Sequence, residues 1–155
     1  MHNLVKHIVK NIGISLFLLI SILITTQAQS EQTAEDIIKN RKALFSKNYN
    51  TAKKVQSLSS SGDFDAAKKL MLQMSENYKN LLEMFPDNTK EGFKTEVTSL
   101  VWEEKDKFNF LMEKSSNDMI ELASVIEETD NVRGVLGQLM WGNCKACHSK
   151  YRVEH

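Results

Sequence analysis

The chain has few of the residues that interrupt helices or build disulfide frameworks. Of its 155 residues, one is proline, six are glycine and two are cysteine. The single proline, Pro86, leaves long stretches in which a helix can run without a break. After residue 28, no stretch alternates apolar and polar residues as an amphipathic strand does. Two cysteines exclude a framework of several disulfides. These absences favour an all-α protein.

An excess of charge of one sign is also missing. The chain has 20 Lys and Arg against 20 Asp and Glu. Without the first 28 residues, which contain Lys6 and Lys10, 18 basic and 20 acidic residues remain, a net charge of −2. Such a balance does not favour nucleic acid or an anionic membrane as a partner. The sequence also has no recognisable acid/base pair, and no nucleophile with an activating partner, that would indicate an enzyme.

The first 28 residues have the pattern of a secretory signal peptide. A basic start precedes an apolar run over residues 12–26, and Thr26-Gln27-Ala28 forms a small-residue cleavage site. The apolar run is shorter than the roughly 20 residues of a membrane-spanning helix. We therefore expect export, cleavage of residues 1–28, and a single domain over residues 29–155.

Four segments of that domain carry apolar residues at the three-and-four spacing of amphipathic helices. They cover residues 33–58, 64–85, 97–126 and 132–152. Thr33 and Asp63 are the expected N-caps of the first two helices, and Thr129 or Asp130 of the last. The longest connection is expected at residues 86–94. This pattern predicts an antiparallel four-helix bundle.

The last segment contains Cys144-Lys145-Ala146-Cys147-His148, the C-x-x-C-H signature of covalent haem attachment. Two thiols each add to a vinyl group of the porphyrin, and the adjacent imidazole reaches the iron. On a helix the three side chains fall within a sector of about 100°, on the side that carries the apolar stripe. We expect one haem c, tethered by Cys144 and Cys147, with His148 as the axial ligand.

Two other chemistries use a C-x-x-C pair, a redox dithiol and a zinc site. A reactive dithiol is usually activated at a helix N-terminus, whereas this pair lies near the end of the last helix. Zinc needs four ligands. After residue 28 the chain offers, besides the motif, only His155. Both alternatives are therefore weaker than haem attachment.

The whole set of features resembles the cytochromes c′, the class II c-type cytochromes. The resemblance is carried by Arg41 with an apolar residue four positions later, Phe85-Pro86, Thr89, Trp102, Phe108 and the C-terminal stretch 144–152. Class I cytochromes c carry the haem motif near the N-terminus instead. The resemblance implies a periplasmic homodimer of four-helix bundles, whose haem has an open sixth position that binds NO and CO.

The resemblance also implies roles for individual side chains. Arg41 lies on an apolar stripe, where an unpaired cation is costly, and the resemblance supplies a haem propionate as its anion. The weaker alternative is that the stem of Arg41 packs in the core while its head reaches solvent or a carboxylate of the third helix. Phe45 falls where the family places the residue that faces the open side of the iron. Arg152 matches an arginine beside the proximal imidazole, although a cation there also complements the helix dipole. Lys42 and Thr89 match positions near the haem edge, and many relatives have glutamine in place of Lys42.

Phenylalanine cannot ligate iron, so Phe45 predicts a five-coordinate, high-spin haem that binds NO and CO. Because Phe45 and the carbons of Leu44 offer no hydrogen-bond donor, stable O₂ binding is not expected.

The alternative function is a low-spin electron-transfer cytochrome in which a methionine fills the sixth position. Apart from Met84, the methionines of the mature chain are explained as residues of the core stripes, and none takes the position of Phe45. His155 lies on the proximal side. The sequence does not indicate a redox partner.

Overall fold

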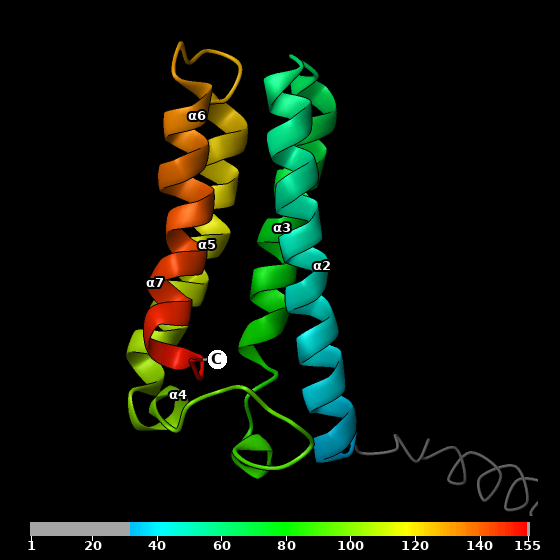
Figure 1. Cartoon of the computed structure of the whole chain (residues 1–155), viewed down its shortest axis with the longest axis vertical. Coiled ribbons are helices and arrows are strands. Elements are labelled where there is room, and N and C mark those ends of the chain that lie inside the picture. Colours follow the sequence, from blue (N-terminus) through cyan, green and yellow to red (C-terminus); the bar gives the residue numbers. More distant parts are fainter. Residues whose placement is uncertain (1–31, 155) are drawn as a thin grey trace, which may run out of the picture. The chain divides into compact units, whose positions relative to one another are not determined.

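The computed structural model describes residues 32–154, and in this part of the chain the helices form an antiparallel four-helix bundle (Figure 1). The elements are α2 (Ala34–Ser60), α3 (Phe64–Leu82), η1 (Asp87–Thr89), α4 (Leu100–Glu103), α5 (Lys105–Val125), α6 (Val132–Val135), η2 (Leu136–Trp141) and α7 (Gly142–Tyr151). The predicted all-α bundle is confirmed. The predicted signal peptide, residues 1–28, lies outside the described residues. Between residues 32 and 154, no helix combines the length and hydrophobicity needed to cross a bilayer.

Short polar side chains begin the first two long helices, as predicted. Thr33 Oγ1 accepts the backbone N–H of Asp36 at 3.2 Å. Asp63 Oδ1 accepts the backbone N–H of Ala66 at 3.2 Å. Each cap satisfies one of the backbone donors that a helix start leaves unpaired.

The predicted cap of the last helix is wrong. Asn131, rather than Thr129 or Asp130, caps α6, and its Oδ1 accepts the backbone N–H of Gly134 at 3.0 Å. Thr129 Oγ1 instead accepts the N–H of Asn131 at 3.1 Å. Thr129, Asp130 and Asn131 all have side chains that can cap a helix. The course of the backbone turn decides which of the three caps α6.

The connection between the helix pairs is longer than predicted, because α3 ends at Leu82 and α4 begins only at Leu100. It contains η1 and a turn in which Gly92, Phe93 and Lys94 all have positive φ. It ends in a segment that forms one antiparallel bridge with the end of α7, between Val97 and Arg152. The stretch that the sequence assigned to the start of the third helix is therefore extended.

The C-terminal helix changes its winding just before the cysteine motif. Segment η2 is π-helical, and the backbone N–H of Gly142 donates to the carbonyl of Gly137. A Cβ at position 142 would lie 3.3 Å from that carbonyl oxygen, so glycine leaves room for the wide turn. A π turn takes up an extra residue and rotates the next part of the helix about its axis. The sequence predicted a regular helix here.

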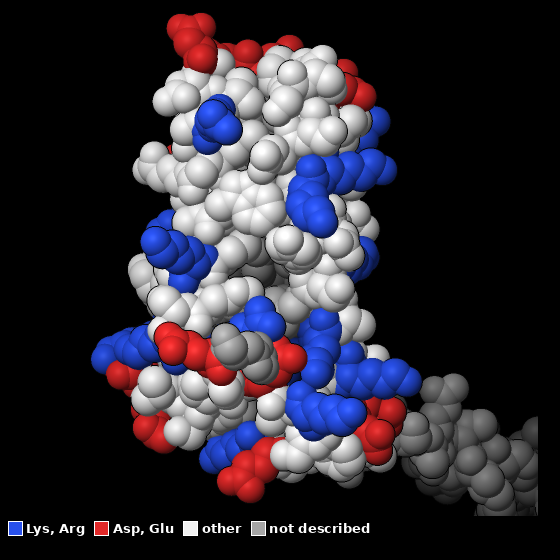
Figure 2. Space-filling model, viewed as in Figure 1, with Lys and Arg blue, Asp and Glu red and all other residues white. Residues whose placement is uncertain are grey.

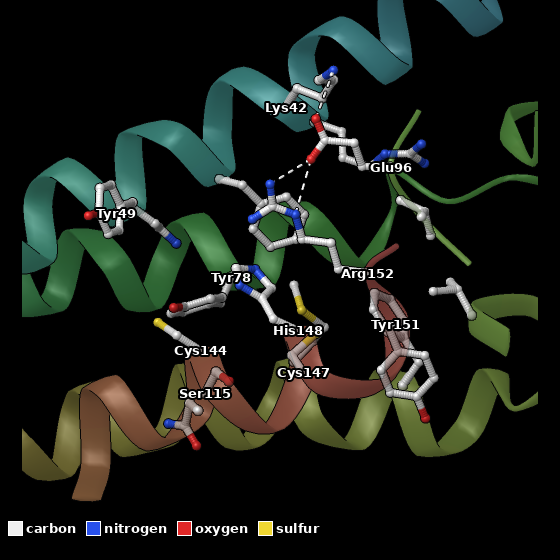
Figure 3. A pocket seen from close by; sticks show the side chains of 18 of the residues that line it. Lys42, Tyr49, Tyr78, Glu96, Ser115, Cys144, Cys147, His148, Tyr151 and Arg152 are labelled. Carbon is white, nitrogen blue, oxygen red and sulfur yellow. Dashed lines mark hydrogen bonds and ion pairs between the residues drawn. The ribbon is translucent and has the colours of Figure 1, made fainter. Parts of the chain in front are cut away.

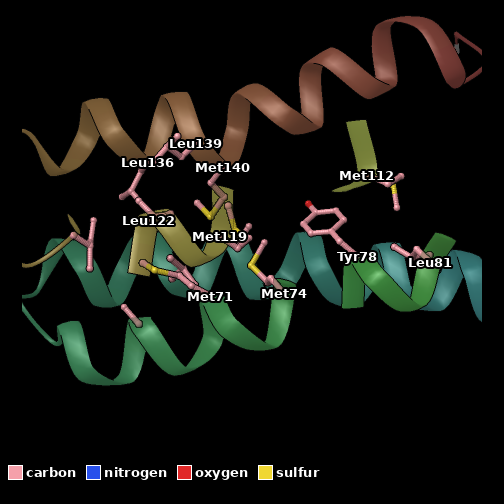
Figure 4. Close-up of a cluster of buried hydrophobic side chains, with 14 of the residues drawn as sticks. Met71, Met74, Tyr78, Leu81, Met112, Met119, Leu122, Leu136, Leu139 and Met140 are labelled. Carbon is pink, nitrogen blue, oxygen red and sulfur yellow. The ribbon is translucent and has the colours of Figure 1, made fainter. Parts of the chain in front are cut away.

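The core is rich in methionine. The group of buried hydrophobic side chains drawn in Figure 4 includes Met71, Met74, Met119 and Met140, none of them more than 1% exposed. Unbranched thioethers fill irregular gaps between helices well. The predicted assignment of these methionines to core stripes is confirmed.

Two buried serines join α3 to α5. Ser75 Oγ and Ser116 Oγ are 2.8 Å apart, and Ser116 Oγ also donates to the carbonyl of Ser75 at 3.1 Å. Small side chains with paired hydroxyls let the two helices pack without leaving a polar atom unsatisfied.

Candidate haem site

A cavity of about 690 Å³ opens between α2 and α7. Both thiols of the motif and His148 lie on its wall. In Figure 2 the opening is a hollow in the middle of the face, flanked by Lys and Arg, with acidic side chains below it and at the two ends of the bundle. The apolar part of the wall includes Phe45, Tyr78, Phe85, Val101, Phe108 and Met112. Such a volume and lining are typical of a site for an organic cofactor.

Cys144 and Cys147 stand beside His148 on α7, with the Tyr78 hydroxyl next to Cys144 (Figure 3). Burial raises the pKa of the Cys144 thiol. Burial, with a smaller effect of Cys144, raises the pKa of Cys147 to about 11. The thiolate is the reactive form of cysteine, so these thiols lack the lowered pKa of a redox dithiol.

The environment of His148 favours its neutral form. Burial lowers the pKa of the imidazole, and the charge of Arg152 lowers it further, whereas Glu96 acts in the opposite direction. Neutral imidazole is the form that ligates a metal. The wall therefore presents two thiols and one neutral imidazole to the same cavity.

Glu96 joins two predicted site residues from opposite sides of the cavity. Arg152 donates from Nε and Nη2 to Glu96 Oε2, at 3.1 and 2.8 Å. Lys42 Nζ lies 3.7 Å from Glu96 Oε1 and donates to the carbonyl of Lys94 at 2.9 Å. Figure 3 shows the three side chains together. The sequence singled out Lys42 and Arg152 but not Glu96, because nothing in the linear pattern distinguishes this glutamate from its neighbours.

Arg41 is 1% exposed and lines the cavity. Its guanidinium donates to the carbonyl of Met84 at 3.0 Å, to Thr89 Oγ1 at 3.2 Å and to Thr95 Oγ1 at 2.8 Å. Its central carbon lies 4.5 Å from the centroid of the Phe85 ring. Burial lowers the pKa of Arg41 to about 10. These hydrogen bonds all end on neutral oxygens, so a buried positive charge remains for an anion in the cavity to balance.

Thr89 differs from the other predicted site residues, because it is not among the residues that line the cavity. It is fully buried, accepts the hydrogen bond from Arg41 and donates to the carbonyl of Pro86 at 2.8 Å. In this structure Thr89 contacts the site through Arg41.

Phe45 lies on the α2 wall of the cavity, across from α7. It is half-buried and meets Phe85 edge to face, with ring centroids 6.4 Å apart. Leu44, its neighbour, is not part of the wall.

Asn143, the residue before Cys144, is fixed by a carboxylate that the sequence analysis missed. Asn143 Nδ2 donates to Asp118 Oδ2 at 2.9 Å and to the carbonyl of Leu139 at 2.7 Å. Asp118 is 7% exposed and also pairs with Lys114. The sequence signal that could have identified Asp118 is the presence of polar residues on the inner side of the third helix. The contact holds the start of α7 against α5 and so positions the cysteine motif.

Comparison with known proteins identifies the family. A family model described as cytochrome C′ matches residues 36–152. The chain belongs to the cytochrome c′ family. A curated cytochrome c′ from Rhodopseudomonas palustris is 28% identical over 122 residues, which cover 77% of this chain and 83% of that relative.

Solved cytochromes c′ share the fold. The structure from Rhodopseudomonas palustris is 27% identical, with a TM-score of 0.70 over 79% of this chain and 98% of that chain. A variant from Alcaligenes xylosoxidans in complex with nitric oxide is 17% identical, with a TM-score of 0.68 over 81% of this chain and 100% of that chain. At this lower identity the likeness concerns the fold alone.

Cytochromes c′ bind haem c, and haem c is the cofactor of this chain. The residues present fit it. The cavity has the size and apolar walls for an organic cofactor, two thiols at the attachment spacing, a neutral imidazole, and a buried cation among neutral partners. The family is a haem-binding carrier type.

Proposed function

We propose that this cytochrome c′ binds NO and CO at a haem iron whose protein ligand is His148. Haem c supplies an iron atom with one coordination position open to diatomic gases. The observation that carries the proposal is the position of Phe45 on the α2 wall, across the cavity from α7. A hydrocarbon ring leaves the facing side without a protein ligand, and the relative captured with nitric oxide has the same fold.

In this proposal each site residue has a specific task. Cys144 and Cys147 hold the porphyrin through thioether bonds, each formed when an S–H adds across a vinyl group. Arg41 pairs with a propionate, which is supported by its buried charge and neutral partners. Thr89 positions the Arg41 guanidinium.

Two cationic residues complete the proposed site. Lys42 lies at the edge of the cavity, and Arg152 lies beside the imidazole of His148. Their shared partner Glu96 supports these positions, because it holds both side chains at the same end of the cavity.

Absorption and EPR spectra of the purified ferric and ferrous protein test this function, followed by titration with CO and NO. The expected result is high-spin iron in both oxidation states, with one equivalent of gas bound per haem. A low-spin ferrous spectrum together with failure to bind CO would contradict the proposal.

The second candidate is a low-spin electron carrier, and one observation favours it. Met112 is 2% exposed and is the only one among the described methionines that lines the cavity. It lies on α5, which packs against α7. If Met112 were an axial ligand, Met112→Leu would convert a low-spin spectrum to high spin. The favoured function predicts the same high-spin spectrum for both proteins.

The proposed location is the periplasm, and the proposed assembly is a homodimer. The signal-like pattern of residues 1–28 and the need to attach haem c after export support the location. Exposed apolar side chains on the first two helices, Tyr49 at 55% and Leu72 at 50%, support a protein contact there. Fractionation of expressing cells and light scattering of the purified holoprotein test these two points.

A further inference from the structure

One polar side chain on the cavity wall has a donor that pairs with no residue in the described part of the chain. Asn48 is 3% exposed and lies three residues, about one helical turn, after Phe45 on α2. Both residues line the cavity. Asn48 Oδ1 accepts a hydrogen bond from Asn77 Nδ2 at 2.7 Å. Among the described residues, Asn48 Nδ2 has no hydrogen-bond partner.

The bond with Asn77 fixes the orientation of the Asn48 amide. Because the oxygen faces Asn77, the NH₂ group is turned away from it. Asn77 is itself 6% exposed and lies on α3, so the amide is held between two helices of the bundle.

The alternative partner is the hydroxyl of Tyr78. Burial raises the pKa of this phenol, and an interaction with the Asn48 side chain acts in the opposite direction, so the two groups lie close together. Among the described residues, however, no oxygen, that of Tyr78 included, accepts a hydrogen bond of good geometry from Asn48 Nδ2. The amide therefore keeps its capacity to donate to a better-placed acceptor.

Two other buried polar side chains on the wall are already paired. Ser115 Oγ donates to the carbonyl of Leu111 at 2.7 Å, and Asn143 Nδ2 donates to Asp118 and Leu139. Buried donors in proteins are nearly always satisfied. A donor left over on the wall of a ligand cavity indicates a partner that enters the cavity.

We propose that Asn48 Nδ2 donates a hydrogen bond to the outer oxygen of a gas molecule bound in this cavity. The proposal rests on the gas-binding function proposed above and specifies its selectivity. Bound NO and O₂ carry more negative charge on the outer oxygen than bound CO does. A fixed N–H donor therefore favours NO and O₂ over CO.

The sequence alone predicted that only hydrocarbon side chains line the α2 side of the cavity, with no hydrogen-bond donor. That expectation rested on Phe45 and Leu44, but Leu44 is off the wall and Asn48 is on it. The Asn48 amide, one helical turn after Phe45, therefore adds a hydrogen-bond donor to a wall that is otherwise apolar at Phe45.

The test compares the C–O stretching frequency of the ferrous CO complex in the parent protein and in Asn48→Leu. Loss of the donor should move the band to higher frequency and make NO dissociation roughly two- to ten-fold faster, the loss of about one hydrogen bond. The matched control is Ser59→Ala, which removes from α2 another buried polar atom that pairs with none of the described residues, at a position off the cavity wall. The control should leave the band in place.

A second measurement needs no variant. In the parent protein, exchange of H₂O for D₂O replaces the amide protons and should shift the Fe–NO or C–O band. A band that is unchanged both in D₂O and in Asn48→Leu would overturn the proposal and assign the amide to Tyr78 or to a haem substituent. A protein that shows no gas-complex band at all would instead contradict the gas-binding function.

Discussion

Val97 and Arg152 pair through their backbones, although 55 positions separate them in the chain. Two hydrogen bonds flank the pair, from Thr98 N to Tyr151 O at 3.1 Å and from Val153 N to Glu96 O at 2.9 Å. This contact fastens the long connection to the end of α7, four residues after His148. It also brings the Glu96 carboxylate to the Arg152 guanidinium.

Glu96→Gln should raise the reduction potential of the haem. Removal of a negative charge close to His148 favours the reduced haem, because the reduced form carries one positive charge fewer than the oxidised form. The effect on stability should be below about 1 kcal/mol, because the ion pairs with Lys42 and Arg152 are partly exposed. Redox titration measures the potential, with Glu113→Gln on the exposed side of α5 as the control. Equal shifts in both variants would show that Glu96 has no specific effect on the site.

Arg41→Leu should lower the free energy of unfolding of the holoprotein by roughly 1.5–3 kcal/mol, since it leaves the hydroxyls of Thr89 and Thr95 without their charged donor. Urea unfolding followed by helix content measures this. Lys39→Leu, at an exposed position of the same helix, is the control and should change stability little. If Arg41→Leu is as stable as the parent protein, the guanidinium does not hold the connection in place.

Phe45→Ala should accelerate CO association, because a small side chain removes the ring from the wall across from α7. The loss of stability should stay below the roughly 3–5 kcal/mol of a fully buried phenylalanine, since Phe45 is half-buried. Flash photolysis measures the rate. Phe110→Ala, at a side chain that is 64% exposed, should leave it unchanged.

Phe45→Met is a second test of whether residue 45 faces the haem iron. It introduces a thioether, a known axial ligand of haem iron, and should produce a six-coordinate low-spin spectrum. If this variant keeps the parent spin state and Phe45→Ala keeps the parent CO rate, Phe45 is an ordinary core residue.

The serine pair between α3 and α5 predicts unequal effects of similar substitutions. Ser116→Ala removes the partner of Ser75 Oγ, whereas Ser75→Ala leaves Ser116 Oγ its bond to the Ser75 carbonyl. We expect Ser116→Ala to lower the free energy of unfolding by about 1–3 kcal/mol, more than Ser75→Ala does. The double variant should lose less stability than the sum of the two single losses. Thermal unfolding of the three variants measures this. Strictly additive losses would show that the hydroxyls do not interact.

Much of the fold was predictable because helix formation depends on local pattern. Three-and-four spacing of apolar residues located the long helices, and Thr33 and Asp63 marked two of their starts. The C-x-x-C-H motif identified the cofactor, since five consecutive residues carry the whole chemical requirement. The third helix start was misjudged for the opposite reason. Val97 fits a helical stripe, but its backbone pairs with Arg152, a partner that only the folded chain brings near.

The amino-acid pattern specifies the all-α class and the haem attachment motif. Which polar groups meet across the cavity depends on the tertiary structure. Glu96 reaches both Lys42 and Arg152, Asp118 fixes Asn143, and the amide of Asn48 lies on the cavity wall with its Nδ2 unpaired among the described residues. A linear pattern records which side of one helix a residue occupies. Pairing and burial depend on what several helices place in the same small volume, and no single helix specifies that.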